Sequence, residues 1–475
     1  MDRIDMGPRF VNIDRDTPWL LPPNLRDWVP ADHLVHFIID AVEVLDLRQV
    51  KVNHRGTGSE QFPPHTLLAL LVYSYATGTF SSRRIEKSTF EHVPVRLLCA
   101  DTHPDHDTIC TFRRENKGLL TETFVKILQL AQCLHLLRVG DLTVSVDGTK
   151  VLASASKHAA VSYEHAGKTL EQLELEIKQL VEKAEQADRT PLQEGLSIPE
   201  EITRRQERKA KLQQARAEIE ARAVVRAVLA QPAHQEKLEA RAARRARGET
   251  VRGPEPQSPS PQPKPTDQYN FTDPQSRIMK AGTGGHFEQA YNAQAAVEVE
   301  SRLILAAPVT DAANDKQQLV PTVSAIPVEA GGVAAVAAVL ADSGFYSEAA
   351  VSALEENAPG QPTGLTVYAA QEKKSHHRTV TDLEVRPEPF APPAGASVSE
   401  VMAHRLRTAA GQARYKLRQQ TVEPIFGIIK SVLGFRQFLL RGKEKVSLEW
   451  VLVSLAYNCR RLHRLGAGQR LAAAG

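Results

Sequence analysis

The sequence predicts an α/β protein in which helices cover a mixed sheet, an all-α region comes first, and an antiparallel coiled-coil hairpin is inserted. Apolar runs with strand character lie near residues 142–152, 293–306 and 333–341. Short helical patterns with capping residues fill the first quarter of the chain. Residues 163–250 carry apolar positions at coiled-coil spacing. A chain of 475 residues is expected to form two or three domains.

The composition narrows the class of protein. A hydrophobic content of 42% and a charged content of 24% suit a globular fold. No apolar run is long enough to span a bilayer, and MDRIDMGPRF lacks the apolar stretch of a signal peptide. No Cys-x-x-Cys pair occurs, so we expect reduced core thiols rather than a zinc site at Cys99, Cys110, Cys133 and Cys459. We therefore expect a cytoplasmic protein with no membrane partner.

Residues 1–135 are predicted to form a helical domain. A first helix begins after Pro30, a second covers residues 65–77, and Ser81-Ser82 and Asp107-Thr108 cap two more. Arg113 and Arg114 lie near the end of the last of these helices. Short helices with arginines at their ends are typical of a helix-turn-helix that reads DNA. An ordinary helical bundle with solvated arginines fits this pattern equally well.

The next element is a strand that delivers a carboxylate. Leu142, Val144 and Val146 alternate with polar residues, and Asp147-Gly148-Thr149 then has the composition of a turn. A carboxylate at the end of an apolar strand is held rigidly, as a metal site or a general base requires. A turn aspartate that caps a loop is the alternative.

The segment 163–250 is predicted to be an inserted hairpin of two helices. The first helix has a seam that alternates spacings of three and four, and a second charged helix covers residues 200–230. Pro191 and Pro199 break the pattern between the helices, and residues 251–267 form a Pro-rich linker. The first seam consists of Leu170, Leu173, Ile177, Leu180 and Ala184, and the second of Leu212, Ala215, Ile219 and Ala223.

Residues 136–162 and 268–465 are predicted to form one catalytic domain on both sides of this insert. Residues 293–299 and 303–306 have the pattern of a strand hairpin, and residues 315–324 of a helix. The run 333–341 is apolar on both faces, which is typical of a central strand, and it ends at Asp342. A turn aspartate is again the alternative. The Gly- and Pro-rich stretch 359–398 is predicted to be a loop.

A third isolated carboxylate lies in a basic helical region. Glu423 is the one acid between residues 405 and 441. Because Pro424 follows it, the helix is expected either to kink or to begin there. If the helix begins there, Glu423 lies at the positive end of its dipole. A surface salt bridge is the alternative. A basic strip of this kind suits a phosphate backbone, and it consists of Arg405, Arg407, Arg414, Lys416, Arg418, Lys430, Arg436 and Arg441.

The three carboxylates gain meaning as a set. If the fold is a mixed sheet covered by helices, Asp147, Asp342 and Glu423 converge. Three carboxylates can hold two divalent cations about 4 Å apart, as enzymes that cut phosphodiesters require. Oxygen ligands of this kind suit Mg²⁺, with Mn²⁺ as a substitute.

Four segments in this order resemble the insertion-sequence transposases of bacteria, whose DDE triad lies on an RNase H-like fold. They are the Asp-Gly-Thr strand end, TDPQSRIMK with YNAQAAV, LADSGFYS, and YKLRQQTVEPIFGIIK. The resemblance implies that Asp147, Asp342 and Glu423 are the catalytic, metal-binding triad. It also implies that Tyr415, Arg418 and Lys430 belong to a Tyr-Arg-Glu-Lys signature that contacts the transposon end.

One spacing departs from this family. Its signature has Arg four residues before Glu, whereas Gln419 stands there and Arg418 lies five residues before Glu423. Which of Arg418 and Arg414 has the signature role is therefore open, while Glu423 and Lys430 keep their spacing. In the family the helical N-terminal region binds DNA, so the resemblance favours DNA contacts by Arg113 and Arg114.

The resemblance implies a DNA transposase that binds its own terminal inverted repeats and carries out metal-dependent strand cleavage and strand transfer. Its partners would be double-stranded DNA, both transposon ends and target, and a second copy in a homodimeric synaptic complex associated with the nucleoid. Two alternatives remain open: a metal-dependent DNA nuclease without strand transfer, and an inert DNA-binding scaffold. The hairpin would be an interaction or DNA-clamping element.

Overall fold

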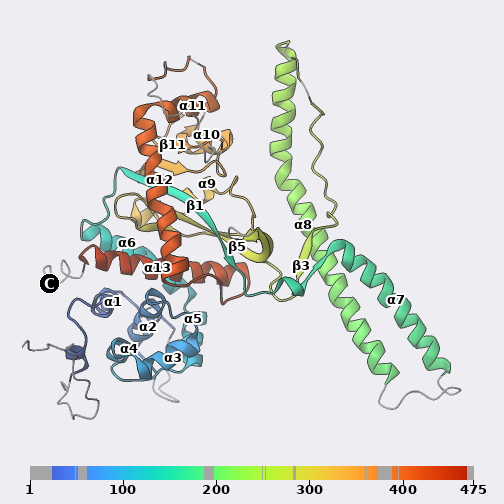
Figure 1. Ribbon diagram of the computed structural model, residues 1–475, viewed down its shortest axis with the longest axis horizontal. Coiled ribbons are helices and arrows are strands. Elements are labelled where there is room, and N and C mark those ends of the chain that lie inside the picture. The colour runs from blue at the N-terminus through green and yellow to red at the C-terminus, as the bar shows by residue number, and fades with distance from the viewer. Residues whose placement is uncertain are drawn as a thin grey trace, which may run out of the picture.

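The computed structural model describes residues 24–48, 50–51, 61–186, 197–248, 250–251, 253–281, 285–358, 361–372, 388–393 and 395–467. It is an α/β structure with a mixed sheet, a group of N-terminal helices and a long helical arm to one side, as Figure 1 shows. The α/β class predicted from the sequence is confirmed. Across the described ranges, no helix has both the length and the apolar character needed to span a membrane.

The main sheet has seven strands, with β1 at its centre. Its path runs β11-β8-β1-β5-β4, and β6 and β7 also pair with β5. β1 is antiparallel to β5 and parallel to β8, and β8 is parallel to β11. These strands are β1 (Leu142–Leu152), β4 (Arg277–Ala281), β5 (His286–Glu298), β6 (Ile304–Ala306), β7 (Val309–Thr310), β8 (Val336–Ala341) and β11 (Thr366–Ala369).

The predicted turn after Asp147 is wrong. β1 continues to Leu152, and Gly148 and Thr149 pair with Gln294 and Ala293 of β5. Close packing, and not a turn, explains the glycine at this position. A Cβ at Gly148 would lie 2.4 Å from Gln294 Nε2 and 2.7 Å from Asp315 Oδ1, so the strand needs a residue without a side chain there.

Several other predicted strands agree with the structure. The predicted hairpin at residues 293–306 forms as the β5–β6 pair, and β8 covers most of the predicted central strand. Residues 333–335 form a 3-10 helix before β8, and the predicted helix at residues 315–324 is limited to α9 (Leu319–Ser324). The predicted loop at residues 359–398 is wrong at residues 366–369, where β11 forms the sheet edge.

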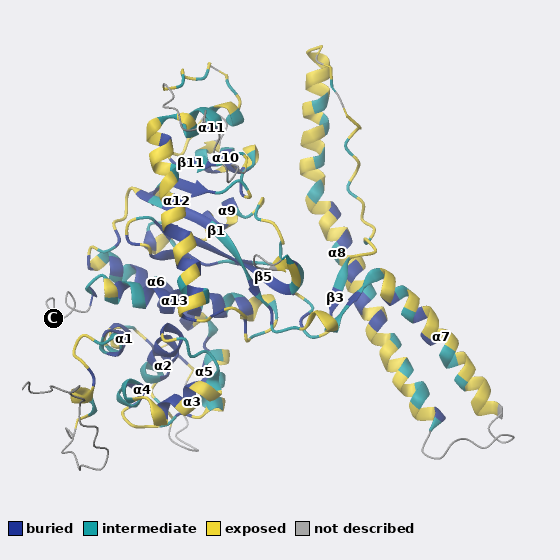
Figure 2. Cartoon of the chain, viewed as in Figure 1, coloured by how far each residue is buried: buried dark blue, intermediate teal, exposed yellow. Residues whose placement is uncertain are grey.

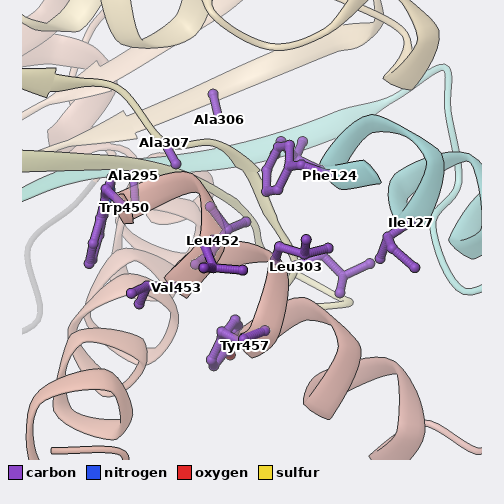
Figure 3. Packing of buried hydrophobic residues seen from close by; sticks show 14 of the residues in the cluster. Phe124, Ile127, Ala295, Leu303, Ala306, Ala307, Trp450, Leu452, Val453 and Tyr457 are labelled. Carbon is purple, nitrogen blue, oxygen red and sulfur yellow. The ribbon is translucent and has the colours of Figure 1, made fainter. Parts of the chain in front are cut away.

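Helices α12 (Ala409–Gly427) and α13 (Lys443–Arg464) carry the C-terminal part of the fold. α12 contacts β1, β5, β8 and β11, while α13 packs against α6 (Lys117–Cys133) and β7. Figure 3 shows Trp450 and Leu452 of α13 packed beside Phe124 of α6 and Ala295 of β5. Trp450 is fully buried, and its indole N–H donates to the Gln294 carbonyl at 2.9 Å. Burial of such large side chains fixes these helices on the sheet.

Helix α12 runs through Pro424, so it does not begin there. Of the two alternatives, the one in which Glu423 lies at a helix N-terminus is therefore wrong. Proline removes one helical N–H donor, and a π-helical turn, Ile428–Val432, follows directly. The apolar residues of this region, Val422, Phe426, Ile429 and Leu433, are buried. Two further helices flank this part, α10 (Glu348–Glu355) and α11 (Val398–Arg407).

The N-terminal helices pack onto α13. Arg460 donates to the Ala76 carbonyl at 3.0 Å, and buried Glu449 accepts from Leu439 and Leu440 amides and lies 3.4 Å from the Tyr75 hydroxyl. The helix predicted from Asp107-Thr108 is one or two residues longer, because Asp105 is its N-cap. The helices are α1 (Leu34–Glu43), α2 (Pro64–Ala76), α3 (Ser82–Glu91), α4 (Val93–Leu98) and α5 (His106–Glu115).

The insert consists of α7 (Tyr163–Gln186) and α8 (Ile198–Ala246), which pack side by side and extend away from the sheet (Figure 1). Leu170 and Leu173 of α7 share a buried cluster with Leu212 and Ala215 of α8. The second helix does not end at residue 230 as predicted, because α8 accommodates Pro232 and continues. Pro191 lies outside the described residues, and Pro199 lies in the first turn of α8.

The predicted seam weakens toward the tip of this arm. Ile177 and Leu180 are half-buried, Ala184 is exposed, and Figure 2 shows mostly exposed residues along both helices. The segment after α8 returns along it, with Arg241 donating to the Pro254 carbonyl. Small two-stranded sheets are formed by β2 (Ala160–Ser162) with β3 (Gln268–Asn270) and by β9 (Glu356–Ala358) with β10 (Gln361–Pro362).

All four cysteines are free thiols. Cys99 and Cys459 are buried as predicted, and Cys110 is half-buried. The expectation of a core position is wrong for Cys133, which is exposed at the end of α6.

Candidate active site

Asp147 is a carboxylate held inside the fold by the middle of β1. Its side chain is 17% exposed. Burial, followed by the negative charge of Asp342, raises its pKa to about 7, while the Arg418 guanidinium acts in the opposite direction. Asp147 and Asp342 are therefore close enough in space to repel each other, although 195 positions separate them in the sequence (342 minus 147).

Asp342 follows β8 directly, on the strand that runs parallel to β1. β1 pairs with β8 up to Ser145 and Leu340, so Asp147 and Asp342 each lie two residues beyond this last pair. The Gly344 amide donates to Asp342 Oδ1 at 2.8 Å, which orients the carboxylate at the strand end. Parallel pairing with matched ends is what brings these two carboxylates together.

Glu423 reaches the same place from α12. Arg418, one helical turn earlier, has its Nη2 2.9 Å from Glu423 Oε1 and its Nη1 3.4 Å from Asp147 Oδ2. Glu423 is exposed, whereas the Arg418 side chain is 11% exposed. One guanidinium thus bridges a carboxylate of the sheet and a carboxylate of the helix.

The sequence also predicted DNA contacts for Tyr415, Lys430 and Arg414 in this region. Burial raises the pKa of Tyr415, and Arg418, Asp342 and Asp147 act on its hydroxyl electrostatically, so Tyr415 lies beside the carboxylates. Lys430 Nζ donates to the Lys150 carbonyl of β1 at 2.7 Å. Arg414 is exposed on α12.

The two arginines predicted to bind DNA from the N-terminal region have partners within the protein. Arg113 is half-buried and donates to the Tyr75 hydroxyl at 3.1 Å. Arg114 is exposed and donates to Thr111 Oγ1 at 3.1 Å. Their part in DNA binding stays a prediction.

The carboxylates here are suitable ligands for a divalent cation, although they do not form a complete coordination site. Among the residues that the structure describes, no three His, Cys, Asp or Glu side chains stand close enough to hold a metal ion. The donor chemistry nevertheless fits a hard cation. Two carboxylates repel each other without a counter-ion, and the Arg418 guanidinium stands between Asp147 and Glu423 as a positive charge.

Two family models match separate parts of the chain. A transposase DDE domain matches residues 374–463, and a transposase domain of the DUF772 family matches residues 23–115. The two matches together indicate an insertion-sequence DDE transposase. No curated protein and no solved structure matches the chain.

The matched regions cover only part of the candidate site. The DDE match contains Tyr415, Arg418, Glu423 and Lys430, and the DUF772 match contains Arg113 and Arg114. Neither match reaches Asp147 or Asp342. The assignment of these two residues rests on the strand geometry described above.

Sequence reasoning missed a polar cluster beside the carboxylates of this transposase. Asp315 Oδ1 accepts from Asn292 at 2.6 Å and from Gln294 at 2.7 Å, and Lys150 Nζ lies 3.6 Å from Asp315 Oδ2. Asn292 and Gln294 were available as a signal. Two amides inside residues 290–297, which are otherwise Ala, Tyr and Val, are unusual, because buried polar groups require partners.

Proposed function

We propose that this chain is a DDE transposase that binds the terminal inverted repeats of its own element and catalyses metal-dependent DNA strand cleavage and strand transfer. The observation that carries the proposal is the Arg418 guanidinium, which pairs with carboxylates from two distant segments, Asp147 and Glu423. Asp147 and Asp342 come from the ends of the same parallel pairing, and Arg418 connects Asp147 to Glu423.

The sheet supports an RNase H-like assignment for the catalytic domain. Such a core has three antiparallel strands followed by two parallel ones, with the first strand in the middle. Here β1 is antiparallel to β5, which carries β6 and β7, and is parallel on its other side to β8, followed by β11. β8 and β11 reach the sheet through helical connections, as parallel pairs require.

Asp147, Asp342 and Glu423 would hold the divalent cations. Bound there, such cations activate a water or a 3′-hydroxyl and stabilise the leaving oxygen. Asp147 would bind such a cation in its ionised form. Arg418, which pairs with Asp147 and Glu423, would remain the neighbouring positive charge.

The DNA would lie along the basic residues around this site. Arg414 is exposed one turn before Arg418, and Arg436 is exposed just beyond the π-helical turn. The N-terminal helices, packed on α13, would contribute recognition of the inverted repeat, and the α7–α8 arm would clamp DNA or a second copy in a homodimeric synaptic complex. Cations spread over these elements suit a long duplex.

A strand-transfer reaction tests the proposal. The substrate is a duplex that carries the inverted repeat flanking the reading frame, given either intact or pre-cleaved, with a second duplex as target and Mg²⁺ present. The wild-type protein is expected to cut the intact end and to join the pre-cleaved end to the target. Asp147→Ala is expected to do neither while it still binds the end.

Each other outcome identifies a different protein. Cutting without joining would show a nuclease, and binding with no Mg²⁺-dependent cutting by the wild type would show an inert scaffold. Cutting by Asp147→Ala at the wild-type rate would remove Asp147 from the site.

A further inference from the structure

The polar cluster beside the carboxylates has no role in the chemistry described so far. It contains Lys150 of β1, Asn292 and Gln294 of β5, and Asp315 from the segment between β7 and α9. Lys150 pairs with Asn292 and Gly148 with Gln294 across the two strands, so these side chains share one face of the sheet.

Asp315 is fixed at the centre of this cluster. Its Oδ1 accepts from both amides, at 2.6 Å and 2.7 Å, and Asn292 and Gln294 are fully buried. The Asn292 side chain also donates to the Ala312 carbonyl at 3.1 Å, which ties the Asp315 segment to β5. Burying two amides costs free energy unless they are bonded, so the cluster holds one carboxylate in one orientation.

Gly148 is part of the same arrangement. Its missing side chain leaves the space that Gln294, Asp315 and Asn292 fill, at 2.4 to 2.9 Å from where a Cβ would lie. Gly148, the residue next to the candidate catalytic Asp147, therefore makes room for the polar cluster. Asp147 and this space occupy adjacent positions of β1.

Lys150 is the group that this arrangement orients. Its side chain is 19% exposed, and its Nζ has a loose contact with Asp315 Oδ2 at 3.6 Å. Among the described residues Lys150 forms no other ion pair, which leaves ammonium protons for a ligand. Burial lowers the pKa of Lys150, and Asp315, Asp147 and Asp342 oppose that effect in this order, so the ammonium lies within electrostatic reach of the candidate triad.

Asp147 and Lys150 are three positions apart on β1, so their side chains leave the strand on opposite faces, and the effect of Asp147 and Asp342 on Lys150 acts across the strand. The β1–β8 pairing ends at Ser145, and the Lys150 carbonyl accepts from Lys430 Nζ at 2.7 Å. Lys430, from the predicted DNA-binding signature, and Lys150 therefore meet at one point of β1. Arg418 is engaged by two carboxylates, so these lysines are the nearby cations with free capacity for phosphate.

We propose that Lys150 is a further DNA-contacting residue, which binds a phosphate next to the one that is cut, and that Asp315, fixed by Asn292 and Gln294, positions it. The proposal rests on the proposed function, because it needs DNA at the triad. The ligand class is a phosphodiester of duplex DNA. Lys150 contacts the substrate, and Asp315 acts only through Lys150.

The test measures binding and cutting separately on the full-length protein. Binding of the inverted-repeat duplex is followed at several salt concentrations, and single-turnover nicking is followed in Mg²⁺ at saturating protein. Lys150→Ala is expected to reduce the salt slope of binding by about one phosphate contact. It is expected to slow nicking on the order of 10-fold to 100-fold, and Lys150→Arg should regain the slope.

Two further variants separate position from charge. Asp315→Asn keeps an oxygen for the two amides and leaves Lys150 charged, so the salt slope should stay at the wild-type value while nicking slows. Lys157→Ala is the matched control, since Lys157 lies shortly after β1 and pairs with Glu288 at 3.0 Å. It should leave both the slope and the nicking rate unchanged.

Each failure has its own reading. A wild-type slope with Lys150→Ala overturns the phosphate contact, even if the wild type never nicks. A wild-type nicking rate with Asp315→Asn overturns the positioning role. If the wild-type protein binds the duplex but does not nick it, the proposed function fails, while the salt slopes still decide the role of Lys150. If the wild type does not bind DNA at all, both proposals are wrong.

Discussion

Arg418 is the residue whose surroundings say most about the site. It is nearly buried, and its two terminal nitrogens contact Asp147 and Glu423. A buried cation beside two carboxylates is stable only while all three charges compensate one another. The arginine thus holds Asp147 and Glu423 near each other.

Exchange of single residues should separate chemistry from binding. Glu423→Gln keeps the shape of the side chain and removes one ligand charge, so nicking should be abolished with a loss of several kcal/mol of transition-state stabilisation. It should leave end binding largely intact, since it removes no cation. A Mg²⁺-dependent nicking assay and a gel shift measure the two effects.

Lys430→Ala is the complementary variant. It should weaken end binding and lower the salt slope by about one phosphate contact, because Lys430 is a half-buried cation at the edge of β1. Nicking by Glu423→Gln at the parental rate would remove Glu423 from the triad.

Gly148 gives a test of the space beside Asp147. Gly148→Ala sets a methyl group against Gln294, Asp315 and Asn292, and should cost about 1–3 kcal/mol of stability and slow nicking. Gly118→Ala is the control, because no atom lies within 4 Å of its Cβ position and α6 favours alanine. Urea denaturation of both variants gives the two free energies. Equal stability of both variants would show that Gly148 is not tightly packed.

Local sequence could predict Asp147 and not its surroundings. The apolar alternation before Asp147 is a local signal, and the strand does deliver the carboxylate. Asp-Gly-Thr looks like a turn because glycine usually serves backbone freedom, whereas here it makes room for side chains more than 140 positions later. Likewise, the spacing of Arg418 left its role open, and only the fold brings it to Asp147.

At the scale of elements, periodic patterns were informative and proline rules were not. The seam of α8 is buried as predicted at Leu212, Ala215, Ile219 and Ala223. α8 nevertheless continues through Pro232, and α12 through Pro424. A helix of this length tolerates one missing N–H donor when its other hydrogen bonds and its packing are retained. β11 was missed because four residues between loop segments carry too little pattern.

The pairing of α7 with α8 can be tested in the full-length protein by substitutions within the arm. Ala215 is fully buried between the helices, while Ala217 is exposed on the same helix. Ala215→Asp buries an unpaired charge and should destabilise the arm by more than about 2 kcal/mol, and Ala217→Asp should have little effect. Limited proteolysis should then cut α7 and α8 in Ala215→Asp and leave the catalytic domain intact. Equal protection of both variants would argue against packing of the two helices.

At the scale of the molecule, the N-terminal helices and the catalytic sheet share one interior. Buried Glu449 of α13 connects Tyr75 of α2 to the amides of Leu439 and Leu440, in the segment that follows the π-helical turn. A single hydrophobic cluster runs from the first helix to α13. Side-chain packing therefore connects the N-terminal helices to the C-terminal segment that carries Lys430.

The convergence of Asp147, Asp342 and Glu423 on one cation site is tested most directly by cleavage of the protein itself. Fe²⁺ that replaces Mg²⁺ generates hydroxyl radicals with ascorbate and peroxide, and these radicals cut the backbone near the bound ion. The proposed triad predicts cuts close to all three carboxylates, and their loss with excess Mg²⁺ or in Asp147→Asn. Cuts confined to one of these segments, or cuts elsewhere that Mg²⁺ does not suppress, would contradict a shared site.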